Sequence, residues 1–202
     1  MKNDVIKNIT NKTLGILGGG QLGKMIAIEA SRLGIKTCIF DPNKNAPAFQ
    51  NANIIINSDY TNKKALGQFI KCSDKITYEF ENIPLESLNF LEKNSQIFPG
   101  IKALKYSQDR LLEKEFISNL GISVAPFYQI KNYVDVKGAL KKLKGTAILK
   151  TRKFGYDGKG QYLIKKYNIP NIKDNIEKNK YIIEEIIKFK KEISVIVIIK
   201  KD

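Results

Sequence analysis

The sequence predicts an α/β fold in which a small doubly wound parallel sheet is followed by a second unit of mixed α+β structure. From Thr13 to about Gly100, short apolar runs alternate with polar helical stretches, the rhythm of parallel strands covered by helices. From about Ala125 the pattern changes to β-prone runs on either side of a glycine-rich turn. A chain of 202 residues with 43% hydrophobic content can hold two such units with a real core.

The first unit opens on the stretch LGILGGGQLGKM, residues 14–25. Its glycines at 18, 20 and 23 satisfy G-x-G-x-x-G between an apolar run and a helical stretch, which is typical of nucleotide-binding folds. A second expected strand, 37–41, ends in Asp41, about where an NAD-binding fold places the acid that holds a ribose hydroxyl. These residues alone leave an NAD site open as one interpretation.

The alternation continues to the end of the first unit. Strands are expected at 52–57, 75–80 and 96–100, and helices at 63–72, 84–94 and 107–121. Ser107 is placed to cap the last helix and Gly121 to end it. On the strand 75–80 and its continuation, Glu79 and Glu81 are two apart, so we expect both carboxylates on one side, at the sheet edge where α/β folds bind ligands. A solvated acidic strand end is the alternative.

The second unit is expected to be a lid-type α+β module. The pattern predicts a helix over 132–143 and strands over 146–150, 161–166, 181–187 and 192–200. In the last of these, Ile193, Val195, Val197 and Ile199 would lie on one face.

The most informative segment is ILKTRKFGYDGKGQ, residues 148–161. A strand ending in Lys150, followed by Gly155, Gly158 and Gly160, has the unobstructed backbone N–H groups and the ammonium charges needed to cover a polyphosphate. A β-hairpin in which Asp157-Gly158 is only a turn is an equal alternative. The spacing does not fit a Walker loop.

Composition narrows the function classes. The net charge of +15 is scattered along the chain without interleaved aromatic residues, so we expect no nucleic-acid partner. No stretch has the length and apolarity of a signal peptide or a membrane span, so we expect a cytoplasmic protein with no membrane association. Cys38 and Cys72 lack the spacing of a metal site and are expected to be buried thiols.

Several of these segments together resemble one family. The loop KTRKFGYDGKGQ resembles that of the N5-carboxyaminoimidazole ribonucleotide synthases, which belong to the ATP-grasp superfamily. Five further segments resemble the same family in the same order: GGGQLGKM, YEFENIP (78–84), SQDR (107–110), GISVAP (121–126) and residues 182–198. The resemblance implies an extension at 1–12, a Rossmann-like pre-ATP-grasp domain at 13–105 that binds no NAD, and an incomplete ATP-grasp domain at 106–202. Asp41 is then a strand-end residue that starts a turn with Pro42.

The resemblance also implies site residues. Arg110 and Lys150 would contact ATP phosphates, and Glu192 the ribose hydroxyls. Further ATP contacts are implied for Gly155, Tyr156, Asp157, Gly158, Lys159, Gly160 and Gln161, and around the adenine for Glu184, Glu185, Ile186 and Ile187. The aminoimidazole ribonucleotide would lie against Gly20, Gln21, Leu22, Glu79, Glu81 and Tyr156. Taken singly, without the ordered set of motifs, Arg110, Glu184 and Glu185 would be interpreted as ordinary solvated surface charges.

The implied reaction is the ATP-dependent carboxylation of aminoimidazole ribonucleotide by bicarbonate through carboxyphosphate, in purine biosynthesis, by a homodimer at full length. Magnesium would bridge the phosphates, and its ligands are expected beyond residue 202, with no metal ligand in this chain. The resemblance identifies no catalytic residue here either. We therefore expect the chain to be a fragment that is inactive alone. Phe154 stands where many relatives have glycine, and the chain has no histidine. Alternatives are another ATP-grasp ligase or transformylase of purine synthesis, and a non-catalytic nucleotide-binding module.

Overall fold

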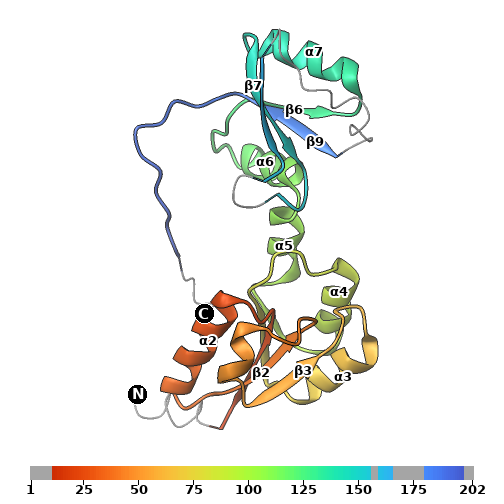
Figure 1. The fold of residues 1–202 in the computed structure, drawn as a ribbon, viewed down its shortest axis with the longest axis vertical. Helices are drawn as coiled ribbons and strands as arrows, with labels where there is room; N and C mark the ends of the chain where they lie inside the picture. The colour runs from red at the N-terminus through yellow and green to blue at the C-terminus, as the bar shows by residue number, and fades with distance from the viewer. Residues whose placement is uncertain (1–10, 156–158, 166–179, 198–202) are drawn as a thin grey trace. The chain divides into compact units, whose positions relative to one another are not determined.

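The computed structural model describes residues 11–155, 159–165 and 180–197. The chain separates into two compact units, Met1–Glu113 and Lys114–Asp202, each with its own sheet (Figure 1). This confirms the expected fold class, a parallel α/β unit followed by an α+β unit.

The first unit is a five-stranded parallel sheet in the order β3-β2-β1-β4-β5. Its strands are β1 (Thr13–Leu17), β2 (Lys36–Asp41), β3 (Ile54–Asn57), β4 (Lys75–Tyr78) and β5 (Ile97–Phe98). Its helices are α2 (Gln21–Arg32), η1 (Pro47–Asn51), α3 (Lys63–Lys71), α4 (Leu85–Asn94) and α5 (Ile101–Ser107). The strand order reverses between β1 and β4, and the carboxyl ends of strands at such a point are where α/β sheets bind ligands.

Both faces of this sheet are buried, as a doubly wound fold requires. Ile16 and Ile39 pack with Ala27 of α2 on one face, while Leu17 and Phe40, the next residue along each strand, pack into the larger cluster on the other. That larger cluster includes Phe69 and Leu66 from α3 and Leu88 and Leu91 from α4. Side chains alternate between the two faces of a strand and repeat every 3.6 residues along a helix. The apolar positions in the sequence therefore determine which helix covers which face of the sheet.

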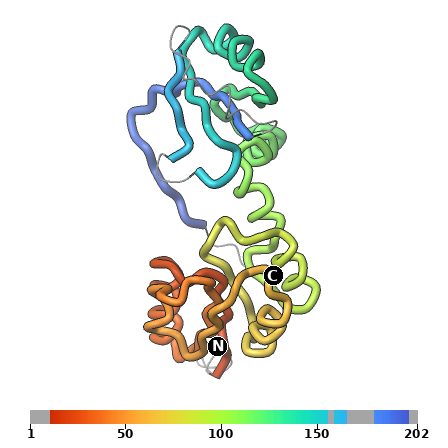
Figure 2. The backbone as a smooth tube through the Cα atoms, turned by 45° about the vertical axis from the view of Figure 1, so that its right-hand side comes forward, coloured from red at the N-terminus to blue at the C-terminus, as the bar shows by residue number. Residues whose placement is uncertain are grey.

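The second unit is a four-stranded antiparallel sheet in the order β6-β9-β7-β8. Its elements are β6 (Phe127–Ile130), α7 (Tyr133–Lys142), β7 (Thr146–Thr151), β8 (Gln161–Lys165) and β9 (Tyr181–Glu184). The strands β7 and β8 run side by side as a hairpin (Figure 2). Asn132 and Asp135 form a capping box at the start of α7, and Val136 and Leu140 of this helix pack on Leu149 and Ile183 of the sheet.

The prediction that Ser107 caps a helix is wrong. Ser107 is the last residue of α5, and α6 (Arg110–Asn119) begins after Asp109, whose Oδ1 accepts a hydrogen bond from Leu111 N at 3.0 Å. The aspartate takes the capping role because the chain turns between two helices there.

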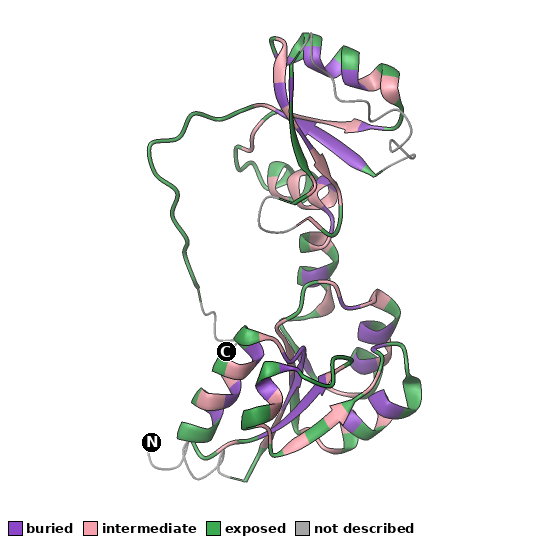
Figure 3. Cartoon of the chain, in the orientation of Figure 1, coloured by how far each residue is buried: buried purple, intermediate pink, exposed green. Residues whose placement is uncertain are grey.

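The strand expected at 192–200 does not form within the described residues, which end at 197. Residues 191–197 are exposed along their whole length (Figure 3), with Ile193 81% and Ile196 91% exposed. A β-prone run becomes a strand only where a neighbouring strand pairs with its backbone, so propensity alone misplaced this element.

Two helical glycines provide a matched test of the packing in the first unit. A Cβ on Gly23 of α2 would lie 2.6 Å from the Gly18 carbonyl oxygen, whereas one on Gly67 of α3 would meet nothing within 4 Å. We predict that Gly67→Ala raises the free energy of unfolding by about 0.5–1 kcal/mol, the helix propensity gain, while Gly23→Ala lowers it by about 1–3 kcal/mol through overpacking. Urea denaturation measures both; a gain in both variants would contradict the close packing of α2.

Candidate functional site

The glycine-rich loop between β1 and α2 is held by two carboxylates. Gly19 N donates to Asp41 Oδ2 at 2.7 Å, and Gly20 N donates to Glu79 Oε1 at 2.8 Å. Gly18 has φ +100°, the left-handed region that favours glycine, and a Cβ there would lie 2.7 Å from Glu79 Oε1. The loop amides that the sequence offered for a phosphate are therefore already bonded to acids at the ends of β2 and β4.

Both carboxylate oxygens of Asp41 already accept hydrogen bonds within the first unit. Its Oδ1 accepts a hydrogen bond from Asn43 N at 2.7 Å, which forms the predicted turn, and its Oδ2 lies 3.3 Å from the Tyr60 hydroxyl as well as on Gly19 N. The Tyr60 ring stacks on Phe40, with centroids 5.7 Å apart, which fixes the hydroxyl. Asp41 thus ties the glycine loop to β2, a role that sequence reasoning missed.

Glu79 and Glu81 do not lie on a strand, in contrast to the prediction. The strand β4 ends at Tyr78, because the chain turns there to hold the glycine loop. Glu79 is half-buried; burial raises the pKa of its carboxyl, the Gly20 N–H opposes the rise, and the negative Asp41 adds to it. Glu81 is exposed, and its carbonyl accepts a hydrogen bond from Gln108 Nε2 at 2.6 Å. The two acids therefore have different environments.

Gly20, Gln21 and Leu22 lie at the amino end of α2. Gly20 is the residue before the helix, and Gln21 and Leu22 are exposed in its first turn. This end of α2 lies beside the point where the strand order reverses, so the three residues have the access that a ligand contact needs.

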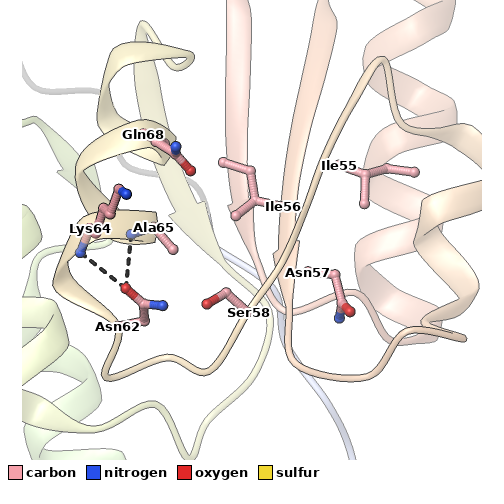
Figure 4. Close-up of a pocket in the computed structure, with 8 residues that line it drawn as sticks. All are labelled: Ile55, Ile56, Asn57, Ser58, Asn62, Lys64, Ala65 and Gln68. Atoms are coloured by element: carbon pink, nitrogen blue, oxygen red, sulfur yellow. Dashed lines mark hydrogen bonds between the residues drawn. The ribbon is translucent and has the colours of Figure 1, made fainter.

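An open pocket of about 410 Å³ lies between β3 and α3 (Figure 4). No residue that the sequence predicted for a site lines it. Lys64 N and Ala65 N, at the start of α3, both donate to Asn62 Oδ1 at 3.1 Å, so these helix amides are already capped. The lining residues are Ile55, Ile56, Asn57, Ser58, Asn62, Lys64, Ala65 and Gln68.

The second sheet carries a cluster of three charges. Glu184 ends β9 and forms an ion pair through Oε1 with Lys150 of β7, while its Oε2 lies 2.8 Å from Lys114 Nζ on α6. The register explains the first pair: Ile148 stands opposite Glu184, so Lys150, two residues on, lies on the same face of the sheet. Among the predicted site residues the structure thus brings Lys150 and Glu184 into contact, and it adds Lys114.

The cluster is poorly solvated. The Glu184 side chain is 6% exposed, and those of Lys114 and Lys150 are 18% and 20% exposed. Burial disfavours the charged carboxylate, but the two lysines outweigh this effect and lower the pKa of Glu184 below its ordinary value. Two ammonium groups share one carboxylate, so the cluster has one positive charge in excess, which is suited to a phosphate.

The glycine-rich segment after Lys150 joins β7 to β8, which pair as antiparallel strands. Thr151 N donates to Gly160 O at 2.9 Å, and Gly160 has φ +71°. Phe154, 72% exposed, has φ +59°, in the region where glycine is preferred. Gly155 is half-buried, and Lys159 and Gln161 are exposed. Tyr156, Asp157 and Gly158 lie outside the described residues.

The remaining predicted residues lie at the start of α6 and in the segment after β9. Arg110 begins α6 and belongs to the first compact unit. Glu185 follows β9, and its N–H donates to Pro126 O at 2.9 Å. Ile186, Ile187 and Glu192 continue along the same segment with exposed side chains.

Two family models match the chain. A model described as the ribonucleotide synthetase preATP-grasp domain matches residues 11–108, and an ATP-grasp domain model matches residues 115–202. The chain therefore belongs to the ATP-grasp superfamily, with a ribonucleotide synthetase pre-ATP-grasp domain ahead of ATP-grasp residues.

Within that superfamily the chain is similar to N5-carboxyaminoimidazole ribonucleotide synthases. It is 41% identical to that of Brucella melitensis over 187 residues, 91% of this chain and 52% of that protein, and 39% identical to that of Bacillus subtilis over 186 residues, 92% and 49%. The crystal structure of the Staphylococcus aureus synthetase complexed with ADP matches with a TM-score of 0.83 and 39% identity, over 90% of this chain and 49% of that one. The chain spans about half the length of the curated relatives it matches.

Two features are absent from the described residues. They contain no group of three or more histidine, cysteine, aspartate or glutamate side chains that could hold a metal ion. In the same part of the chain, no helix combines the length and apolarity that crossing a bilayer demands.

The buried ion pairs predict a pH dependence of stability. Because the folded-state pKa of Glu184 lies below its ordinary value of 4.5, its pairing stabilises the fold above that pH and is lost as the pH falls through the lowered pKa. We predict that Glu184→Gln costs roughly 3 kcal/mol at pH 7, and that the difference from the unchanged protein shrinks steadily below pH 4.5.

Chemical denaturation between pH 7 and pH 3 measures this difference. The matched control is Glu29→Gln, which removes an ion pair to Arg32 whose side chains are 63% and 71% exposed and which we expect to contribute little at any pH. A Glu184→Gln difference that stays constant with pH would contradict the assignment.

Proposed function

We propose that the chain binds ATP on the sheet face that carries Lys150 and Glu184, within the expected domain 106–202. The observation that carries the proposal is the buried cluster of two lysines and one glutamate, with its excess positive charge, at the strand that leads into a glycine-rich loop. The ammonium groups and the loop amides suit a polyphosphate. The similar Staphylococcus aureus synthetase was crystallised with ADP, which supports a nucleotide at this fold.

We further propose that this site serves an ATP-dependent ligase that carboxylates aminoimidazole ribonucleotide. ATP phosphorylates bicarbonate to carboxyphosphate, and the exocyclic amine of the ribonucleotide takes up the carboxyl group with release of ADP and phosphate. The names of the relatives support this reaction. Because the chain spans about half their length, the reaction, the homodimer and the cytoplasmic location are proposed for a protein of their full length.

The proposal places the ribonucleotide at the amino end of α2, against Gly20, Gln21, Leu22, Glu79, Glu81 and Tyr156. The exposure of Gln21 and Leu22 at the point where the strand order reverses supports this placement. Since the Gly19 and Gly20 amides already bond to carboxylates, a phosphate would have to displace Asp41 and Glu79. We therefore propose that Glu79 accepts a hydrogen bond from a ribose hydroxyl or an amine of the substrate, and that the Gly19 and Gly20 amides do not bind its phosphate.

In this mechanism the chain's own groups act by charge and by enclosure. Lys150 would bind a phosphate oxygen as a fixed cation, with Arg110 as a second, and the segment 155–161 would cover the phosphates and exclude water that destroys carboxyphosphate. Magnesium would accompany ATP and neutralise part of the phosphate charge, and we propose none of the residues named above as its ligand.

Nucleotide titration tests the ATP site directly. Lys150→Met removes the charge and keeps the apolar stem, while Glu184 retains Lys114 as a partner. We predict that ADP affinity, measured by calorimetry, falls by about 10- to 100-fold, and that Lys141→Met, an exposed lysine of α7, leaves it unchanged. Unchanged affinity in Lys150→Met, or tighter binding of NAD than of ADP, would refute the proposal.

A further inference from the structure

Lys114 is absent from the residues that the sequence motifs suggested for the nucleotide, yet it completes the charge cluster. It lies in the middle of α6, its Nζ is 2.8 Å from Glu184 Oε2, and the same Nζ lies 5.7 Å from the centre of the Phe127 ring on β6. Its side chain is 18% exposed. A lysine held this way by a carboxylate and an aromatic face is fixed in position.

The two lysines occupy opposite oxygens of one carboxylate. Lys150 forms an ion pair with Oε1 and Lys114 forms one with Oε2, and these are the charged groups that act on Glu184, one from β7 and one from α6. If a phosphate draws Lys150 away, Glu184 loses half of its pairing while its side chain remains only 6% exposed. An unpaired carboxylate in that environment is strongly unfavourable, so a second cation is needed.

We propose that Lys114 is a positioning residue of the nucleotide site, which keeps Glu184 ionised and in place so that Lys150 can exchange from Glu184 to a nucleotide phosphate. The inference rests on the proposed ATP site at Lys150. Lys114 does not itself contact the nucleotide in this account. When Lys150 moves from Glu184 to a phosphate, Lys114 remains as the partner of the buried Glu184 carboxylate.

Removal of Lys114 then has a specific consequence. In Lys114→Met, nucleotide binding either leaves Lys150 on Glu184 or forces the buried carboxyl of Glu184 to take up a proton. The affinity falls, and it depends on pH, because proton uptake favours binding at lower pH. A residue that only packed the helix would lower affinity without this linkage to protons.

The test is calorimetric titration of the full chain with ADP at pH 6, 7 and 8, in pairs of buffers with different heats of ionisation. We expect Lys114→Met to bind about 100-fold more weakly at pH 8, to recover toward pH 6, and to take up close to one proton on binding, since one proton changes the affinity about tenfold per pH unit. Lys114→Arg should restore the affinity and the pH profile of the unchanged chain. Lys137→Met is the matched control, since Lys137 of α7 lies 5.6 Å from the Tyr133 ring centre but is exposed.

The outcomes separate the two proposals. Absence of ADP binding by the unchanged chain refutes the ATP site itself. Binding by the unchanged chain, with an identical affinity and pH profile in Lys114→Met, overturns the role of Lys114 alone. If Lys114→Met fails to fold, as judged by circular dichroism, the double variant Lys114→Met with Glu184→Gln removes both charges and should bind ADP with no more proton uptake than the unchanged chain. Additional uptake in the double variant overturns the inference.

Discussion

The organisation of the second unit depends on one buried carboxylate. Glu184 lies at the end of β9, where it joins α6 through Lys114 and β7 through Lys150. A carboxylate in that position is tolerable only when paired, so its presence fixes the two ammonium groups on one face of the sheet. The excess positive charge that makes this face suitable for a phosphate is thus a consequence of how the elements are held together.

In the first unit, acidic side chains bind backbone amides instead of lysine side chains. Asp41 and Glu79 accept hydrogen bonds from the amides of the glycine-rich loop, and so they hold the amino end of α2 against the ends of β2 and β4. Carboxylates are favoured at a helix amino end for the same reason as phosphates, since the unpaired N–H groups there carry partial positive charge. The two glycine-rich segments of the chain therefore differ: the loop after β1 is bonded to two carboxylates of the first unit, and the segment after β7 follows a lysine.

Much of the fold could be predicted from the sequence because its signals are local. The alternation of apolar runs and helical stretches gave the parallel sheet, and Lys150 before a glycine-rich loop gave the candidate nucleotide site. The errors concern contacts made at long range. The run at 192–200 has the composition of a strand but lacks a paired neighbour in the described residues, and Glu79 leaves its strand to bond a loop amide far earlier in the chain. Nothing around Lys114 in α6 signals that it faces Glu184.

The most direct measurement is a magnetic resonance titration of the isotopically labelled chain with ADP. The account predicts that the Glu184 carboxyl carbon, the Lys150 side-chain nitrogen and the Gly155 and Gly160 amides shift together, while the Gly19 and Gly20 amides stay in place. Shifts centred on Gly19 and Gly20, with Glu184 and Lys150 unaffected, would mean that the nucleotide binds at the glycine-rich loop of the first unit, and would contradict the central claim.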